Sequence, residues 1–231
     1  ANVMNVALSY NFKKCIYISS VSTLGRKDGD LEINEESFFS ANKSVSNYAY
    51  SKYYAEQEVW RASSEGINTI ILNPSIILGP GDWNKGSSKI FQTVFNGLKF
   101  YSPGSSGYVD VMDVAKITIQ FLSEKIKNER YILNGTNISF QDVFNQIADE
   151  FKIPRAKYKV TPFLKELAWR VDALKTFFTG MPSLLTKETA NSAMKSVAYS
   201  SKKIKETLKY DFIPIDKTIK EYCRFFEKEL I

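Results

Sequence analysis

The feature that most constrains the fold of this 231-residue chain is a strand–helix–strand succession near its start. Lys13 to Ser19 (KKCIYIS) and Ile67 to Leu72 (INTIIL) are short apolar runs, which are typical of buried strands. Between them, Asn47 to Glu65 lacks Gly and Pro and is closed by Gly66, as at the end of a helix. This order indicates a parallel sheet with crossover helices.

Further along the chain, strand signals become sparse and helix signals increase. Short strands are predicted at 108–111 and 129–133, with Asp113 as the N-cap of a helix between them. Ser139 opens a segment that resembles a capping box. Helices are predicted before Lys13 and over residues 88–98, 139–151, 162–178 and 216–229. The decrease in strand signals and the increase in helix signals along the chain predict a helical lobe on an α/β base.

The composition excludes several kinds of site. The chain has no histidine, so His-based triads and His metal ligands are impossible, and proton transfer must use Tyr, Lys, Cys or carboxylates. Cys15 and Cys223 lie far apart, which fits packing roles in a reducing compartment better than a disulfide framework. The net charge of +6 is spread without a block of like charges, so nucleic-acid binding is not expected.

The apolar segments predict no membrane insertion. No signal peptide and no apolar run of about 18 residues is present, so a cytoplasmic location is expected. The predicted helix 162–178 lacks the strongly basic polar face of an interfacial helix. We expect its apolar stripe to pack inward; the stripe consists of Phe163, Leu167, Val171, Leu174 and Phe178.

Tyr48 and Lys52 form a candidate proton-transfer pair in the predicted helix 47–65. Side chains four residues apart share one helix face, with Cβ atoms about 5 to 6 Å apart. An ammonium about 5 Å away, at an effective dielectric constant of about 20, stabilises a phenolate by about 3 kcal/mol. A tyrosine in this setting becomes a usable acid or base near neutral pH.

The same spacing occurs three times, so context must choose among the pairs Tyr10/Lys14, Tyr48/Lys52 and Tyr199/Lys203. Only the middle pair lies on a crossover helix between two predicted strands. Those strands end in Ser19-Ser20 and in Asn73-Pro74-Ser75. Because chemistry gathers at the carboxyl ends of parallel strands, the helix can present its tyrosine beside Ser20.

Four segments, in this order, resemble the extended short-chain dehydrogenases/reductases, also called the NAD-dependent epimerase/dehydratase family. They are YISSVSTLG at 17–25, YAYSK at 48–52, NPSIILGPGD at 73–82 and GYVDVMDVA at 107–115. The resemblance covers nearly the whole chain. It implies an α/β fold with part of a Rossmann-like, doubly wound parallel sheet and a smaller, mostly helical substrate-binding lobe. The expected NAD(P)-binding domain comprises residues 1–80 and 108–136, and the expected lobe comprises 81–107 and 137–231.

The resemblance also implies roles for individual residues. Tyr48 would donate or accept the proton of the substrate oxygen, Ser20 would hydrogen-bond that oxygen, and Lys52 would activate the tyrosine and bind the nicotinamide ribose. The implied cofactor is NAD or NADP, whose chemistry the protein orients. The implied cofactor-binding residues are Tyr48, Lys52, Asn73, Pro74 and Ser75.

The chain departs from the family's pattern at its start. The strand, glycine-rich turn and helix that open such a domain do not occur in the sequence. We expect residue 1 to lie inside the helix before the serine strand, with on the order of 80 residues upstream at roughly 30 per βαβ unit. The choice between NAD and NADP stays open, because the residue that reads the ribose 2′ position would lie there.

Two positions distinguish branches of the family. Dehydratases carry Thr-Asp-Glu where this chain has Ser20-Val21-Ser22, and sugar epimerases carry Tyr where Leu24 and Leu78 precede glycines. The apolar replacements resemble the dihydroflavonol reductase and 3β-hydroxysteroid dehydrogenase branch. The first hypothesis is therefore an oxidoreductase acting on a ketone or alcohol of an apolar or ring-bearing small molecule.

Two alternatives remain open at this point. One is a nucleotide-sugar epimerase with tightly held NAD, and the other is a cofactor-sensing or scaffold protein without catalysis. The expected partner is a small-molecule substrate, and a homodimer is an open alternative. Neither nucleic acid nor stable membrane insertion is expected.

Overall fold

The computed structural model describes residues 1–25, 32–39, 45–167, 169–170 and 187–229. The chain divides into two compact units. The first unit comprises Ala1–Gly79, Gly107–Thr136 and Ala198–Ile215, and the second comprises Pro80–Ser106, Asn137–Val197 and Asp216–Ile231. Residues 198–215 thus belong to the first unit, whereas the sequence placed them with the second.

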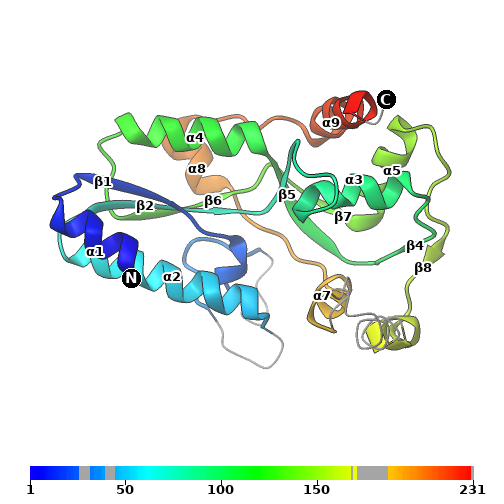
Figure 1. The fold of residues 1–231 in the computed structure, drawn as a ribbon, viewed down its shortest axis with the longest axis horizontal. Helices are drawn as coiled ribbons and strands as arrows, with labels where there is room; N and C mark the ends of the chain where they lie inside the picture. The colour runs from blue at the N-terminus through cyan, green and yellow to red at the C-terminus, as the bar shows by residue number, and fades with distance from the viewer. Residues whose placement is uncertain (26–31, 40–44, 168, 171–186, 230–231) are drawn as a thin grey trace. The chain divides into compact units, whose positions relative to one another are not determined.

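A parallel sheet forms the centre of the first unit (Figure 1). Its strands β1 (Lys14–Ile18), β2 (Asn68–Pro74) and β6 (Glu129–Leu133) lie in the order β1-β2-β6. The register pairs Ile18 with Leu72 and Leu72 with Tyr131, so the carboxyl ends of the strands meet at one edge. The strand–helix–strand prediction is confirmed.

Helices cover both faces of this sheet. Helices α1 (Asn2–Ser9) and α2 (Asn47–Ser64) pack on the face that carries Cys15 and Tyr17. The other face carries Ile16 and Ile18 and packs against α4 (Val111–Ser123) and α8 (Lys202–Leu208). Successive strand residues point to opposite faces, so each strand serves both layers. The doubly wound α/β class predicted from the sequence is confirmed.

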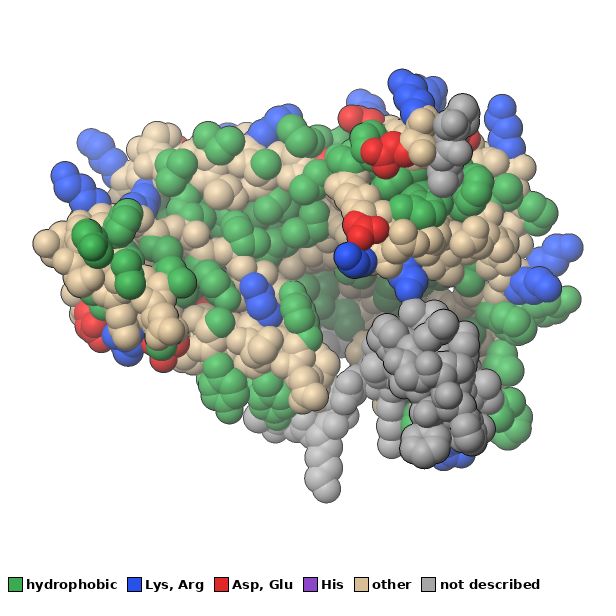
Figure 2. All heavy atoms as spheres, viewed as in Figure 1, with side chains coloured by type: hydrophobic (Ala, Val, Ile, Leu, Met, Phe, Trp, Pro, Cys, Tyr) green, Lys and Arg blue, Asp and Glu red, His purple; other side chains and the backbone are tan. Residues whose placement is uncertain are grey.

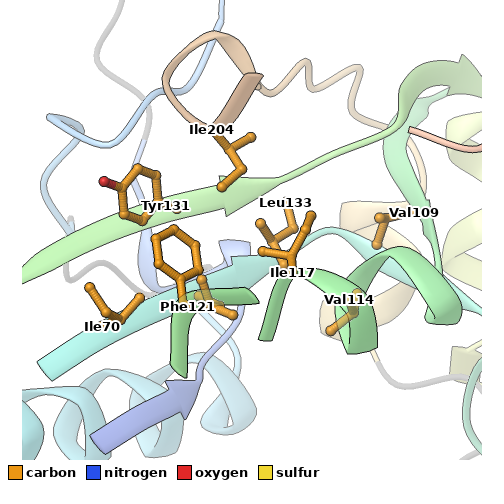
Figure 3. Packing of buried hydrophobic residues seen from close by; sticks show 9 residues of the cluster. Ile70, Val109, Val114, Ile117, Phe121, Tyr131, Leu133 and Ile204 are labelled. Atoms are coloured by element: carbon orange, nitrogen blue, oxygen red, sulfur yellow. The ribbon is translucent and has the colours of Figure 1, made fainter. Parts of the chain in front are cut away.

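The core between the sheet, α4 and α8 consists of interlocking aromatic and branched side chains. Figure 3 shows the Phe121 ring lying against Tyr131, and their ring centroids are 4.8 Å apart. Phe121, Ile117 and Ile70 are completely buried. Fully burying side chains of this size contributes about 1.5–3 kcal/mol each, which makes this layer a main source of stability in the first unit.

Strand β1 is an edge strand within the described residues, because it pairs with β2 alone. Its five residues are half-buried, and Figure 2 shows hydrophobic side chains gathered over this region between α1 and α4. On α1, Val3 and Val6 are exposed as well. An unpaired strand edge of this kind can accept a further strand.

A second sheet of three strands follows the first along the chain. Strand β3 (Ile76–Leu78) pairs with β5 (Ser105–Asp110), and β7 (Thr136–Ser139) completes the order β3-β5-β7. The sequence analysis placed the end of the preceding strand at Asn73-Pro74 and did not predict β3. The structure continues β2 through Pro74, because a proline at the end of a strand removes little of the ladder.

The cap of α4 differs from the prediction. Asp110, not Asp113, is the N-cap, and its carboxylate accepts a hydrogen bond of 2.7 Å from the Met112 N–H. Asp113 lies in the first turn and is completely buried. It accepts hydrogen bonds from the Tyr210 hydroxyl at 2.8 Å and from the Ile213 N–H at 3.0 Å. Both aspartates suit a helix start, and only the tertiary contacts distinguish them.

The second unit is mostly helical in the part that the structure describes. Its helices α3 (Lys89–Phe95), α5 (Phe140–Glu150) and α9 (Ile215–Glu229) accompany the short α7 (Lys187–Ser192) and a small sheet of β4 (Phe100–Tyr101) and β8 (Tyr158–Lys159). Ser139 caps α5 as predicted, accepting from the Asp142 N–H. An aromatic cluster packs this unit, consisting of Trp83, Phe91, Phe95, Phe151 and Phe226.

The predicted inward packing of the helix at 162–178 is wrong for two residues of the stripe. Residues 162–167 and 169–170 are helical, but Phe163 is 79% exposed and Leu167 is 51% exposed. No element in the described part of the chain covers these two side chains, so amphipathic spacing alone did not determine their burial. Val171, Leu174 and Phe178 lie outside the described residues. Within the described ranges, no helix is long and apolar enough to cross a bilayer.

Replacing Asp113 tests its assignment as an internal acceptor. Asp113→Ala should lower the free energy of unfolding by about 1–3 kcal/mol, because the Tyr210 hydroxyl and the Ile213 N–H lose their acceptor. Asp211→Ala is the matched control, since Asp211 is exposed on the segment that carries Tyr210. Urea denaturation of both variants measures the difference. Equal stabilities of the two variants would contradict the assignment.

Candidate active site

Ser20 lies just beyond the carboxyl end of β1. It is the N-cap of the 3-10 turn η1 (Val21–Thr23), and its backbone is extended. The Ser20 Oγ accepts a hydrogen bond of 3.1 Å from the Ser22 N–H. Among the described residues the Ser20 hydroxyl has no acceptor of its own, so its proton can be donated to a substrate oxygen.

Lys52 points from α2 toward the same strand end. Its Nζ donates a hydrogen bond of 2.8 Å to the Ile18 carbonyl and lies 5.0 Å from the centroid of the Tyr17 ring. Burial lowers the pKa of the Lys52 amine, and the negative charge of Glu56 partly opposes that shift. An ammonium has three N–H donors, and Ile18 is its one hydrogen-bond acceptor among the described residues, so two N–H groups can bind a ligand.

Tyr48 lies in the first turn of α2, whose N-cap Ser46 accepts from the Ala49 N–H at 3.1 Å. Its side chain is 58% exposed. It also lies within electrostatic range of Tyr17, because burial, then Glu56 and then Tyr48 raise the pKa of Tyr17. The phenol is therefore accessible to a small molecule while its helix is anchored.

The structure brings the three predicted catalytic residues to one end of the sheet. Helix α2 packs against η1, the turn that Ser20 opens. Lys52 bonds to the carbonyl two residues before Ser20, and Tyr48 precedes Lys52 by one helical turn. Of the three Tyr-x-x-x-Lys pairs, only this one lies within a single helix.

Asn73 lies at the carboxyl end of β2 and is completely buried. The two N–H donors of its side-chain amide are shared among three acceptors, the Ser20 carbonyl at 3.0 Å, the Thr23 hydroxyl at 2.9 Å and the Glu56 carboxylate at 3.0 Å. The amide of Asn73 is thus used inside the protein. Any contact of this residue with a cofactor would use other atoms.

Pro74 and Ser75 continue from Asn73 and are also buried. Pro74 pairs with Leu133 on β6, and the Ser75 N–H donates to the Leu133 carbonyl at 3.0 Å. The Ser75 hydroxyl points to the same carbonyl at 3.3 Å. The cofactor-binding role expected for Asn73, Pro74 and Ser75 stays a prediction.

The sequence analysis missed the residue that connects these groups, Glu56. Its carboxylate is completely buried and accepts from the Ser19 hydroxyl at 2.6 Å and from the Thr23 hydroxyl at 3.0 Å. It also forms an ion pair with Arg130 on β6. The only sequence signal was the spacing, since Glu56 follows Lys52 by four residues on the same helix face.

The fold and the site define a Rossmann-like α/β protein with a Ser-Tyr-Lys arrangement at the carboxyl ends of parallel strands. Residues 1–133 match the NAD dependent epimerase/dehydratase family. The chain therefore belongs to that family.

Individual relatives agree with this assignment. The Synechocystis protein named "Putative dihydroflavonol 4-reductase" is 27% identical over 215 residues, covering 89% of this chain and 62% of the relative. Cinnamoyl-CoA reductase 2 of Arabidopsis thaliana is 27% identical over 210 residues, covering 80% and 63%. The crystal structure of gox2253 superposes with a TM-score of 0.80 at 28% identity, covering 99% of this chain and 70% of that one. The chain thus spans less than two thirds of the length of these two curated relatives.

The state of Lys52 gives the first test of the site. Reductive ¹³C-methylation followed by an NMR pH titration should show one dimethyl-lysine whose pKa lies below the ordinary lysine value, because burial disfavours the charged amine. The Lys52→Arg variant identifies the signal by its loss. A Lys52 signal that titrates at or above the ordinary value would refute the described environment.

Proposed function

We propose that the protein is an NAD(P)-dependent oxidoreductase that reduces a ketone, or oxidises the corresponding alcohol, of an apolar or ring-bearing small molecule. The observation that carries the proposal is that Ser20 and the Lys52 ammonium lie at the carboxyl end of β1, with Tyr48 one helical turn before Lys52 on α2. Family membership supports a nicotinamide cofactor. The names of the two curated relatives, a dihydroflavonol reductase and a cinnamoyl-CoA reductase, support a reductase and a ring-bearing substrate.

The donor set of the chain fits the nicotinamide end of such a cofactor. The two unused Lys52 N–H groups and the exposed Tyr48 hydroxyl can bind the two hydroxyls of a ribose. The sequence holds no glycine-rich fingerprint for the pyrophosphate, so these residues account for the nicotinamide ribose alone. When bound, the cofactor supplies or accepts a hydride.

The roles of the protein groups follow from their hydrogen-bonding capacities. The Ser20 hydroxyl donates a hydrogen bond to the carbonyl oxygen of the substrate and holds that oxygen in place. Tyr48 protonates the same oxygen during reduction and removes the proton during oxidation. The Lys52 ammonium stabilises the phenolate that forms on Tyr48 in the reductive direction. All three roles require a substrate oxygen at the carboxyl end of β1, where Ser20 lies.

The apolar character of the substrate rests on the relatives and not on Leu24 and Leu78. The sequence analysis interpreted these two leucines as signs of an apolar substrate. In the structure Leu24 is 6% exposed and Leu78 is completely buried. Both side chains therefore pack inside the protein and do not form an apolar surface that a substrate could contact.

Tyr48→Phe tests the function, because it removes one hydroxyl and keeps the ring. We expect kcat to fall by about 10²- to 10⁴-fold, the typical loss for a positioned acid. The binding of NADPH should change little. Stopped-flow or steady-state absorbance of NADPH with an aryl ketone, together with cofactor fluorescence, measures both quantities.

Tyr54→Phe is the matched control for this experiment. Tyr54 lies on the same helix and is 64% exposed, so it matches Tyr48 in its element and its exposure, but it follows Tyr48 by six residues and lies on another face of the helix. It should retain wild-type kcat. If Tyr48→Phe keeps more than about a tenth of the wild-type rate, less than about 1.4 kcal/mol of transition-state stabilisation is lost, and the phenol is not the proton donor.

A further inference from the structure

A buried carboxylate behind the candidate active site has no role in the proton transfer proposed above. The Glu56 side chain is 0% exposed. One oxygen, Oε2, accepts from the Ser19 hydroxyl at 2.6 Å, the Thr23 hydroxyl at 3.0 Å and the Asn73 amide at 3.0 Å. The other oxygen, Oε1, forms the ion pair with Arg130. A buried charge is tolerated only when it is compensated in this way.

The partners of Glu56 also hold the peptide of Ser20. The Ser20 carbonyl accepts from the Asn73 amide at 3.0 Å and lies 2.9 Å from the Thr23 hydroxyl, whose single proton it shares with Glu56 Oε2. Ser19, the third partner of Glu56, precedes Ser20 directly. Two groups that fix the Ser20 carbonyl and the residue before it are therefore bound to one carboxylate.

The same carboxylate fixes the helix that carries Tyr48 and Lys52. Glu56 follows Lys52 by four residues and Tyr48 by eight on α2, so the three side chains lie along one face of the helix. Its contacts tie this face to the end of β1, to η1, to the end of β2 and to β6. A shift of the helix relative to Ser20 would break several of these bonds together.

Glu56 also acts on Lys52 electrostatically. Its negative charge raises the pKa of the Lys52 amine against the larger effect of burial. The titratable groups shown to lie against or act on Lys52 among the described residues are Tyr17 on β1 and Glu56 on α2. Glu56 is the carboxylate in this group, so its charge favours the ammonium form.

We infer that Glu56 is a positioning residue that holds the end of β1 and the turn η1, which carry Ser20, against the helix that carries Tyr48 and Lys52, with Arg130 as its counter-ion. The inference rests on the oxidoreductase function proposed above. It assigns a specific catalytic contribution to a side chain that touches neither substrate nor cofactor.

An NMR titration of Lys52 tests the electrostatic part without any turnover. Glu56→Gln should shift the pKa of ¹³C-dimethylated Lys52 below its value in the otherwise unchanged protein, because the opposing charge is gone. Glu58→Gln is the matched control, since Glu58 lies on the same helix in a half-buried ion pair with Arg61. Glu58→Gln should leave the Lys52 signal in place. An unshifted signal in Glu56→Gln would overturn the electrostatic role.

Kinetics of the protein loaded with NADPH test the geometric part. Glu56→Gln should lower kcat by about 10- to 100-fold, the loss expected for a small misplacement of reacting groups, with KM nearly unchanged. The alkaline decline of kcat should begin at lower pH, in parallel with the Lys52 titration. Glu58→Gln should keep the wild-type kcat and pH profile.

Ser19→Ala keeps the experiment decisive if Glu56→Gln does not fold. It removes one hydrogen bond to Glu56 and leaves the ion pair with Arg130 intact. It should lower kcat several-fold, by an amount that its melting temperature does not explain. Wild-type kcat in Ser19→Ala and in any Glu56→Gln that folds would overturn the positioning role.

The Tyr48→Phe variant separates this inference from the function on which it rests. Loss of activity in Tyr48→Phe with full activity in Glu56→Gln would reject the positioning role alone. Full activity in Tyr48→Phe would reject the proposed function itself.

Discussion

The buried carboxylate of Glu56 is the interaction on which the arrangement of the first unit depends. It joins a helix to the ends of two neighbouring strands and, through Arg130, to the third strand of the sheet. Hydrophobic packing between α2 and the sheet is non-directional and leaves the helix free to slide or turn by small amounts. Hydrogen bonds to one carboxylate have directions, so they fix the register of the helix against the strand ends. This register determines the positions of Ser20 and Lys52.

The parallel topology explains why the polar groups meet where they do. The ends of β1 and β2 lie side by side because Ile18 pairs with Leu72, and the polar residues at these ends are Ser19-Ser20 and Asn73. A crossover helix returns between them and starts near the same edge, which places Tyr48 in its first turn. The residues of the site therefore come from three consecutive elements, β1, α2 and β2, whose ends meet at one edge of the sheet.

Much of this arrangement could be predicted from the sequence, because it depends on local patterns. The apolar runs, the long helix with its stop at Gly66 (φ +115°) and the cap of α5 at Ser139 follow from periodicity and backbone preference. Glu56 could not be identified, since a carboxylate on a helix is usually solvated and only the fold buries this one. The exchange of Asp113 for Asp110 as helix cap has the same origin, because the deciding partners Tyr210 and Ile213 lie about 100 residues away. Phe163 shows the opposite case. Its place in an apolar stripe predicts burial, but its side chain is exposed.

The fate of an isotopic label on the cofactor tests the proposed hydride transfer to the substrate most directly. NADH or NADPH with deuterium at both C4 positions of the nicotinamide ring would be incubated with the purified protein and an aryl ketone, and the product analysed by mass spectrometry. We predict an alcohol with deuterium on its carbinol carbon and one cofactor molecule oxidised for each alcohol formed. A product without deuterium, or a sugar nucleotide epimerised with no net change in the cofactor, would contradict this prediction.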